Sequence, residues 1–238
     1  PRYSGRAQMW AMGGCGAVMG FYDGFFGPGT GSLLVFLLVR ILGFDFLQAS
    51  AHSKVLNLAS NMAALLYMVP LSFSIAISAR ISYWKGAGQY QQMKQSMHIG
   101  FQITMFLALC LSTLLWLFHQ PIANIYAKDA AVADMAGQLL ILIGFYHLVD
   151  ALQTLCFFVL RSFKVTLAPA FVYSTVLWGV GLAGGFQLTY NGLGPIDAMP
   201  TPGAFWLMNI VGLVFVSACL LWLIQYHLKQ NKQAESRI

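Results

Sequence analysis

The feature that most constrains this chain is a long apolar run with one acid inside it. Residues 136–160 are long enough to cross a bilayer, which takes about 20 apolar residues, and Asp150 is the only Asp, Glu, Lys or Arg among them. A carboxylate at that depth is costly, and a chain that keeps one usually turns it toward a partner, a cavity or an ion path. We therefore expect Asp150 to lie inside a helix assembly. Arg161 and Lys164 follow the run and are expected at the membrane edge.

The composition indicates an integral membrane protein. The 238 residues are 58% hydrophobic and 8% charged, whereas soluble domains carry roughly 25% charged residues. The net charge of +6 comes from scattered cations, which fits basic loops against an anionic leaflet and does not indicate a nucleic-acid partner. The sequence shows no nucleophile triad, phosphate loop or metal-ligand spacing, so we expect neither an enzyme nor a metal site.

Hydropathy predicts an all-α, polytopic membrane protein with six or seven membrane segments. Gln8–Phe26 is apolar, but Asp23–Gly31 holds four glycines and a proline, which predicts a broken or re-entrant element. Residues 49–84 form either one long helix bent at Pro70 or two short helices. The other expected segments are a half-helix over 32–42 and spans over 96–118, 134–160, 165–190 and 203–228. The expected polar connections are 85–95, 119–133 and 191–202, with a polar tail over 229–238. The connection over 119–133 is expected to include a short amphipathic piece around Pro121–Ala127.

Alternate connections are basic, which predicts the orientation. The basic residues from Lys85 onward fall into three groups: Lys85 and Lys94; Arg161 and Lys164; Lys229, Lys232 and Arg237. The intervening connections carry Lys128 beside Asp129, Asp134 and Asp197. The positive-inside rule places the three basic groups, and therefore the C-terminus, in the cytoplasm.

Several separated motifs follow Tyr67 in a fixed order. They are Met68-Val-Pro70, Pro121-Ile-Ala, Asp150-Ala-Leu-Gln153, Lys164-Val-Thr166, Trp178-Gly179 and Gly203-Ala-Phe205-Trp206. In these motifs the chain resembles the C-terminal lobe of NorM-like multidrug and toxic compound extrusion (MATE) transporters. The resemblance implies five helices of one lobe of an ion-coupled multidrug efflux antiporter, and so a truncated transporter.

The same resemblance implies a cation and substrate site. An acid at the position of Asp150 helps such transporters bind the coupling Na⁺ or H⁺, or a cationic drug, and Tyr146 matches a tyrosine near that acid. The alternative is a buried Asp that hydrogen-bonds to a neighbouring helix. Gln153, one turn from Asp150, either contacts substrate or packs against its neighbours. No cofactor is expected besides the coupling ion.

The first part of the chain carries other motifs. Asp23–Gly31, followed by Ala51-His52-Ser53-Lys54 and Asn57, resembles the first repeat of sulfite-exporter-type (TSUP) permeases. This resemblance implies that Ser53, Lys54, Asn57, Gly29 and Gly31 bind an anion such as sulfite or a sulfonate. The alternative is a lysine at a helix start that extends its charge toward the interface.

The two resemblances together describe a hybrid, with a TSUP-like fragment over residues 1–66 and a MATE-like lobe over residues 67–238. The expected function is multidrug efflux of the MATE type; the alternatives are an anion permease and an inactive hybrid membrane fragment. The expected location is the bacterial inner membrane. The expected partners are the lipid bilayer, small organic cations or drugs, and a second lobe or a second copy of the chain.

Overall fold

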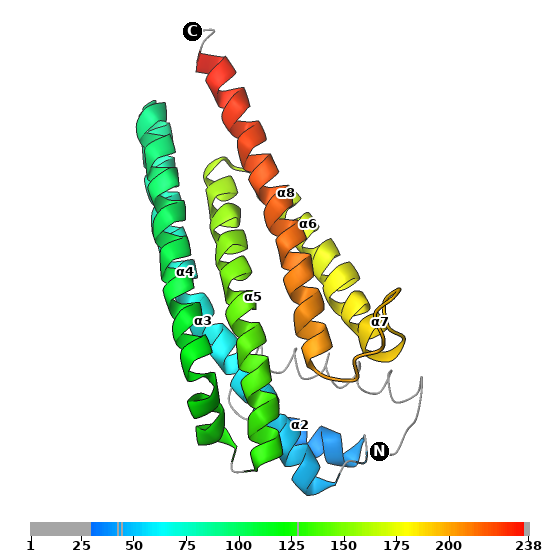
Figure 1. The fold of residues 1–238 in the computed structure, drawn as a ribbon. Coiled ribbons are helices and arrows are strands. Elements are labelled where there is room, and N and C mark those ends of the chain that lie inside the picture. The colour runs from blue at the N-terminus through cyan, green and yellow to red at the C-terminus, as the bar shows by residue number, and fades with distance from the viewer. Residues whose placement is uncertain (1–29, 42, 44, 128, 236–238) are drawn as a thin grey trace. The chain divides into compact units, whose positions relative to one another are not determined.

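The structure is a computed structural model that describes residues 30–41, 43, 45–127 and 129–235, and the elements in this part of the chain are helices (Figure 1). The elements are α2 Thr30–Arg40, α3 Phe46–Gly86, α4 Tyr90–Tyr126, α5 Ala130–Ser162, α6 Leu167–Val176, the π-helix η1 Leu177–Gly184, α7 Gly185–Tyr190 and α8 Gly203–Glu235. The predicted all-α class is confirmed. Of the predicted glycine-rich break, Thr30 and Gly31 are helical and the rest lies outside the described residues.

Among the described residues, five segments are long and apolar enough to cross a membrane: Phe46–Gly86, Tyr90–Ile125, Ala130–Ser162, Leu167–Tyr190 and Gly203–Gln230. The α2 helix has 11 residues, fewer than the about 20 that a crossing takes. The total of six or seven segments stays a prediction, because the first apolar stretch lies outside the described residues.

Some helix ends differ from those that hydropathy predicted. The α3 helix is one continuous helix through Pro70, which decides between the two alternatives for residues 49–84. The predicted loop over 119–133 is wrong in its first half, because α4 runs through Pro121 to Tyr126. A proline removes one backbone donor, and a helix that is already long tolerates that loss within a membrane protein.

The polar connections are also shorter than predicted. Only residues 87–89 separate α3 from α4, and α8 continues past residue 228 into the polar tail as far as Glu235. Gln, Lys and Glu are good helix formers. Hydropathy therefore marks where a span leaves the apolar layer, whereas the helix itself continues.

The described chain divides into two compact units: unit 1, residues 1–62 and 119–137, and unit 2, residues 63–118 and 138–238. In unit 2, α5 is the central helix, since 61% of its apolar window is buried against 33% or less for the other four spans. Its residues Leu155, Val159 and Leu160 pack with Leu220 of α8 in the main apolar cluster. The other fully or largely buried members of this cluster are Ile81, Met93, Cys156, Phe163, Val176, Val216 and Ile224.

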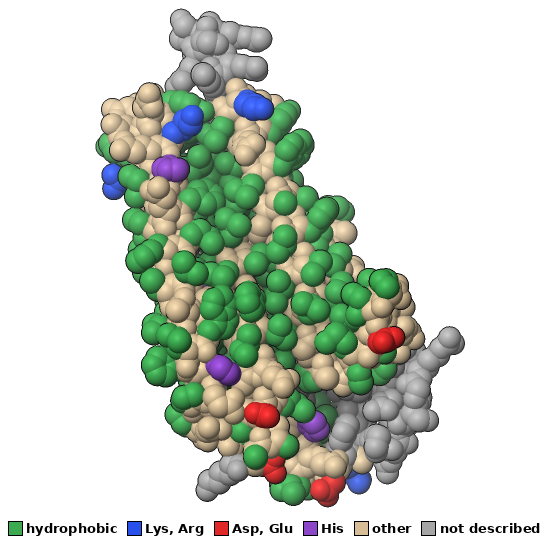
Figure 2. Space-filling model, viewed as in Figure 1, with side chains coloured by type: hydrophobic (Ala, Val, Ile, Leu, Met, Phe, Trp, Pro, Cys, Tyr) green, Lys and Arg blue, Asp and Glu red, His purple; other side chains and the backbone are tan. Residues whose placement is uncertain are grey.

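The three basic segments lie at one end of unit 2. The Tyr90 hydroxyl donates to the carbonyl oxygen of Leu228 at 2.9 Å, and the ring of Phe163 stacks on His227 with centroids 6.5 Å apart. These contacts bring the turns after α3 and α5 to the C-terminal part of α8. On the face shown in Figure 2, hydrophobic side chains cover the helices of this unit, and Lys and Arg side chains lie near that end.

Glycines bring the segment Leu167–Tyr190 close to α8, because small residues let two helix backbones approach each other. A Cβ on Gly181 would lie 2.4 Å from Oδ1 of Asn209, and one on Gly185 would lie 2.7 Å from the ring of Phe205. Gly179 differs, because a Cβ there would meet open space. Gly181 is in the π-helix η1, a rare form with wider turns, and Gly185 is the first residue of α7.

Candidate cation-binding pocket

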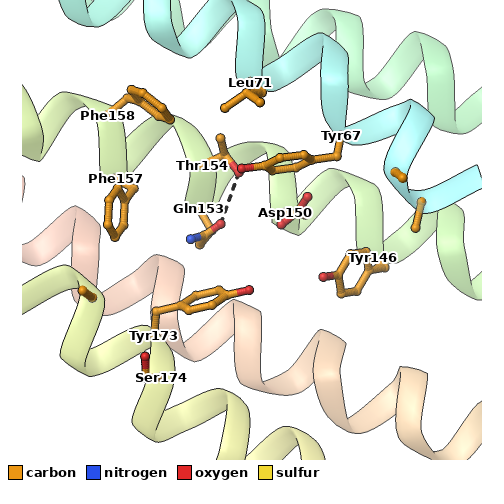
Figure 3. A pocket seen from close by; sticks show the side chains of 13 residues that line it. Tyr67, Leu71, Tyr146, Asp150, Gln153, Thr154, Phe157, Phe158, Tyr173 and Ser174 are labelled. Carbon is orange, nitrogen blue, oxygen red and sulfur yellow. Dashed lines mark hydrogen bonds between the residues drawn. The ribbon is translucent and has the colours of Figure 1, made fainter. Parts of the chain in front are cut away.

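A cavity of about 620 Å³ lies in unit 2 between α3, α5 and α6 (Figure 3). Its volume falls in the range of small-molecule sites, roughly 300–1,000 Å³. The lining residues are Ala63, Ala64, Tyr67 and Leu71 from α3, Tyr146, Asp150, Gln153, Thr154, Phe157 and Phe158 from α5, and Ala170, Tyr173 and Ser174 from α6. Aromatic and small apolar side chains therefore surround a few polar groups.

Asp150 supplies the one formal charge of this lining. The residue is 6% exposed, so its predicted burial inside the helix assembly is confirmed. The described residues that line the cavity include no Lys, Arg or His. An ionised carboxylate taken out of water without a cation is strongly unfavourable. The cavity consequently has a place for one positive charge, either a proton on the carboxyl group or a bound cation.

Three phenol groups surround the acid. Tyr146 lies four residues before Asp150, on the same face of α5, and its ring meets Trp206 of α8 edge-on, with centroids 5.2 Å apart. That contact holds the Tyr146 ring in place. Tyr173 of α6 and Tyr67 of α3 extend toward the same space from two other helices (Figure 3). Phenol oxygens are ligands for a small cation, and the ring faces attract an organic one.

Gln153 and Thr154 complete the polar part of the lining. Both are buried, and the Thr154 hydroxyl donates to Oε1 of Gln153 at 3.2 Å. The Tyr67 side chain lies beside Thr154 (Figure 3). Gln153 thus both lines the cavity and contacts Thr154. Its position is compatible with both alternatives, contact with a substrate and packing against a neighbour.

The predicted cation-site residues Tyr146, Asp150 and Gln153 are therefore together in one cavity, although their role in binding stays a prediction. Sequence reasoning missed Thr154, Tyr67 and Tyr173. Thr154 follows Asp150 by one helical turn, a spacing that could have revealed it. The two tyrosines are on other helices, and no local pattern in the sequence brings them to the acid.

The residues of the alternative anion site lie in unit 1 and differ in their surroundings. On α3, Ser53 is buried, Asn57 is half-buried and Lys54 is exposed. Gly31 is in α2, and Gly29 lies outside the described residues. Anion binding by this set stays a prediction. In the described part of the chain, no group of three or more His, Cys, Asp or Glu side chains is placed to hold a metal ion.

The fold and the pocket together define a class of protein. Membrane-spanning helices that line a pocket with a buried acid are the arrangement of a membrane transporter. Comparison with known proteins gives the family. The MatE family model matches residues 49–186, more than half of the chain. The chain belongs to the MatE family.

Relatives with curated names agree. The chain is 30% identical over 180 residues to a probable multidrug resistance protein NorM of Aromatoleum aromaticum, which covers 76% of the chain and 39% of the relative. It is 29% identical over 199 residues to the multidrug resistance protein MdtK of Pectobacterium atrosepticum, covering 84% of the chain and 42% of that relative. The MdtK protein of Yersinia pseudotuberculosis is 31% identical over 197 residues, covering 83% and 41%.

These findings confirm the resemblance to NorM-like transporters and extend it. The chain spans about two fifths of the length of these relatives. The family match begins at residue 49, so it includes residues 49–66, which the sequence analysis placed in the TSUP-like fragment. The chain is a polytopic membrane protein homologous to bacterial MATE transporters. The TSUP resemblance of the preceding residues stays a prediction.

Proposed function

We propose that the chain functions in ion-coupled multidrug efflux of the MATE type, with Asp150 as the residue that binds the coupling ion or a cationic substrate. The observation that carries this proposal is a buried carboxylate, without a cation among the described lining residues, in an aromatic cavity of about 620 Å³. The proposed substrates are small organic cations or drugs; the relatives are named multidrug resistance proteins, and the negative charge of Asp150 favours a cationic substrate.

The proposed mechanism follows from the charge of the cavity. A Na⁺ ion, a proton or an organic cation neutralises the same carboxylate, so these species compete for it. Transport requires that the affinity of Asp150 for them differs between two conformations, because a ligand shifts an equilibrium only by its differential affinity. Tyr67, Tyr146 and Tyr173 supply hydroxyl oxygens and ring faces to whichever cation is bound.

The proposed location is the bacterial inner membrane, with the C-terminus in the cytoplasm. The support is the position of the three basic segments at one end of unit 2, which the positive-inside rule assigns to the cytoplasm. The bacterial origin of the relatives supports the inner membrane.

The proposed organisation keeps a division near residue 66. The first boundary between the compact units, after Met62, lies close to it, although unit 1 also includes residues 119–137 and the family match runs across residue 66. Transporters of this kind move one lobe or repeat against another. We therefore include in the proposal a second lobe, or a second copy of the chain, as the partner of unit 2.

The test is ion-driven transport of an organic cation dye in vesicles, under a sodium gradient and under a proton gradient. Asp150→Asn retains the shape of the side chain and removes its charge, so it should abolish driven transport and leave the membrane yield unchanged. Asp134→Asn is the matched control, because Asp134 is an exposed acid on the same helix. Its transport should equal that of the unchanged chain.

The outcomes separate the proposal from its alternatives. If Asp150 only packs, Asp150→Asn transports normally, and Asp150→Leu lowers the yield through a lost hydrogen bond. The anion-permease alternative predicts sulfite flux in the same vesicles that Lys54→Gln lowers and Asp150→Asn does not affect. If the unchanged chain is correctly inserted together with a second lobe or a second copy and still transports neither solute, that result would contradict the proposal and favour the inactive fragment.

A further inference from the structure

Three cations surround the turn between α5 and α6. Lys85 comes from the end of α3, Arg161 is in the last turn of α5, where its guanidinium lies over the Phe158 ring, and Lys164 belongs to the turn itself. The Lys85 ammonium lies 4.7 Å from the centroid of the Phe163 ring and 3.5 Å from the carbonyl oxygen of Ser162, to which it donates. These two contacts fix the charge of Lys85 against the turn. Lys85 is half-buried, whereas Arg161 and Lys164 are exposed.

The charge of this group has no acidic neighbour in the segments that build it. Residues 46–128 and 151–196 contain no Asp or Glu. The ammonium groups of Lys85 and Lys164 are also close enough to repel each other. The turn therefore gathers positive charge that no acidic residue of α3, α4 or α6 balances.

Lys164 is at an unusual backbone position for its type. Its φ of 64° lies in the left-handed region. The amide of Lys164 donates to the Arg161 carbonyl and the amide of Val165 to the Leu160 carbonyl, a helix-ending pattern in which this position is usually glycine. A lysine is less favourable than glycine at this φ. The stability of the turn therefore does not explain why a lysine is present at position 164.

The turn also lies at the expected depth of lipid headgroups. Aromatic side chains typical of the membrane–water interface gather at this end of unit 2. They are Tyr83, Trp84, Tyr90, Trp222 and Tyr226. We propose that Lys85, Arg161 and Lys164 bind the phosphate of an anionic phospholipid headgroup. An arginine guanidinium can take two phosphate oxygens at once, and a lysine ammonium acts as a point charge.

The experiment measures thermal unfolding of the full chain in non-ionic detergent during titration with short-chain phosphatidylglycerol. A lipid that binds the folded chain raises the unfolding temperature with its concentration. Lys164→Gly removes one cation and suits the backbone of the turn. It should raise the concentration for half-maximal stabilisation about fivefold, the factor that corresponds to about 1 kcal/mol per cation near an anionic surface. Lys85→Met should have a similar effect.

Two controls make the test specific. Lys94→Gln removes an exposed lysine of α4 that lies over the Tyr90 ring, outside the three-cation group, and should change the half-maximal concentration less than twofold. Phosphatidylcholine, whose headgroup has no net charge, should give a much smaller rise.

Several results would overturn the proposal. An equal response to both lipids would exclude a site for anionic headgroups. An equal weakening by Lys94→Gln and Lys164→Gly would indicate diffuse surface charge. A rise with inorganic phosphate at the same concentrations would indicate a site for free phosphate and not for lipid. If Lys85→Met fails to fold, Lys164→Gly still decides the matter.

Discussion

The hydroxyl of Tyr146 can be tested apart from its ring. The ring packs edge-on against Trp206, and Tyr146→Phe keeps that contact while it removes an oxygen near Asp150. A hydrogen bond is worth about 0.5–1.5 kcal/mol, so the apparent affinity for a transported cation should fall roughly 2- to 10-fold, with normal protein yield. Tyr83→Phe, at an exposed tyrosine outside the cavity, is the control. Equal transport by both variants would contradict a role for the Tyr146 hydroxyl.

At the residue scale, the sequence predicted Asp150 and its helical neighbours but not the whole pocket. An acid in an apolar span can be recognised in the sequence itself. The 3.6-residue period of the helix then predicts that Tyr146, and by the same reasoning Thr154, lies on the same face as the acid. Tyr67 and Tyr173 reach the acid only because α3 and α6 pack on either side of α5. That packing depends on contacts between helices far apart in the chain, which periodicity does not encode.

At the element scale, the packing of Leu167–Tyr190 against α8 gives a paired prediction. Gly185→Ala places a Cβ 2.7 Å from the Phe205 ring and 3.0 Å from its Cα. It should destabilise the chain by about 1–3 kcal/mol, the usual cost of overpacking. Gly179→Ala meets open space and should be neutral or stabilise by about 0.4–1 kcal/mol. Thermal unfolding in detergent measures both, and equal effects would show that this close approach does not govern stability.

The elements themselves were largely predictable, and their ends were not. Residues 191–202 connect the last two spans as the three prolines in that stretch predicted. Hydropathy predicted that the span ends at residue 118, whereas α4 continues through Pro121 to Tyr126. A proline within a helix costs stability, and the sequence does not show how much the surrounding packing contributes against that cost. The π-helical turns of η1 had no signal beyond the cluster of glycines.

At the scale of the whole molecule, the side of the membrane can be determined by labelling. With the four native cysteines replaced, a single cysteine at Gln89 and another at Ala198 should react with an impermeant reagent from opposite sides, Gln89 from the cytoplasm. Both positions are exposed in connections between helices. Gly192, in the same loop as Ala198, is less suitable because its φ is +75° and a Cβ would lie 2.4 Å from a carbonyl oxygen. Reaction of both cysteines from the periplasm would contradict the orientation.

The length of α8 has a practical consequence. Its 33 residues rise about 50 Å along the axis, while the hydrocarbon layer of a bilayer is about 30 Å thick. The basic residues Lys229 and Lys232 fall in the part that follows the last apolar turns. A reporter protein fused after Glu235 would therefore be connected to the membrane span by a rigid helix and not by a flexible linker. Each residue added to the helix would then move the fluorophore about 1.5 Å further from the lipid surface and rotate it about the helix axis by about 100°.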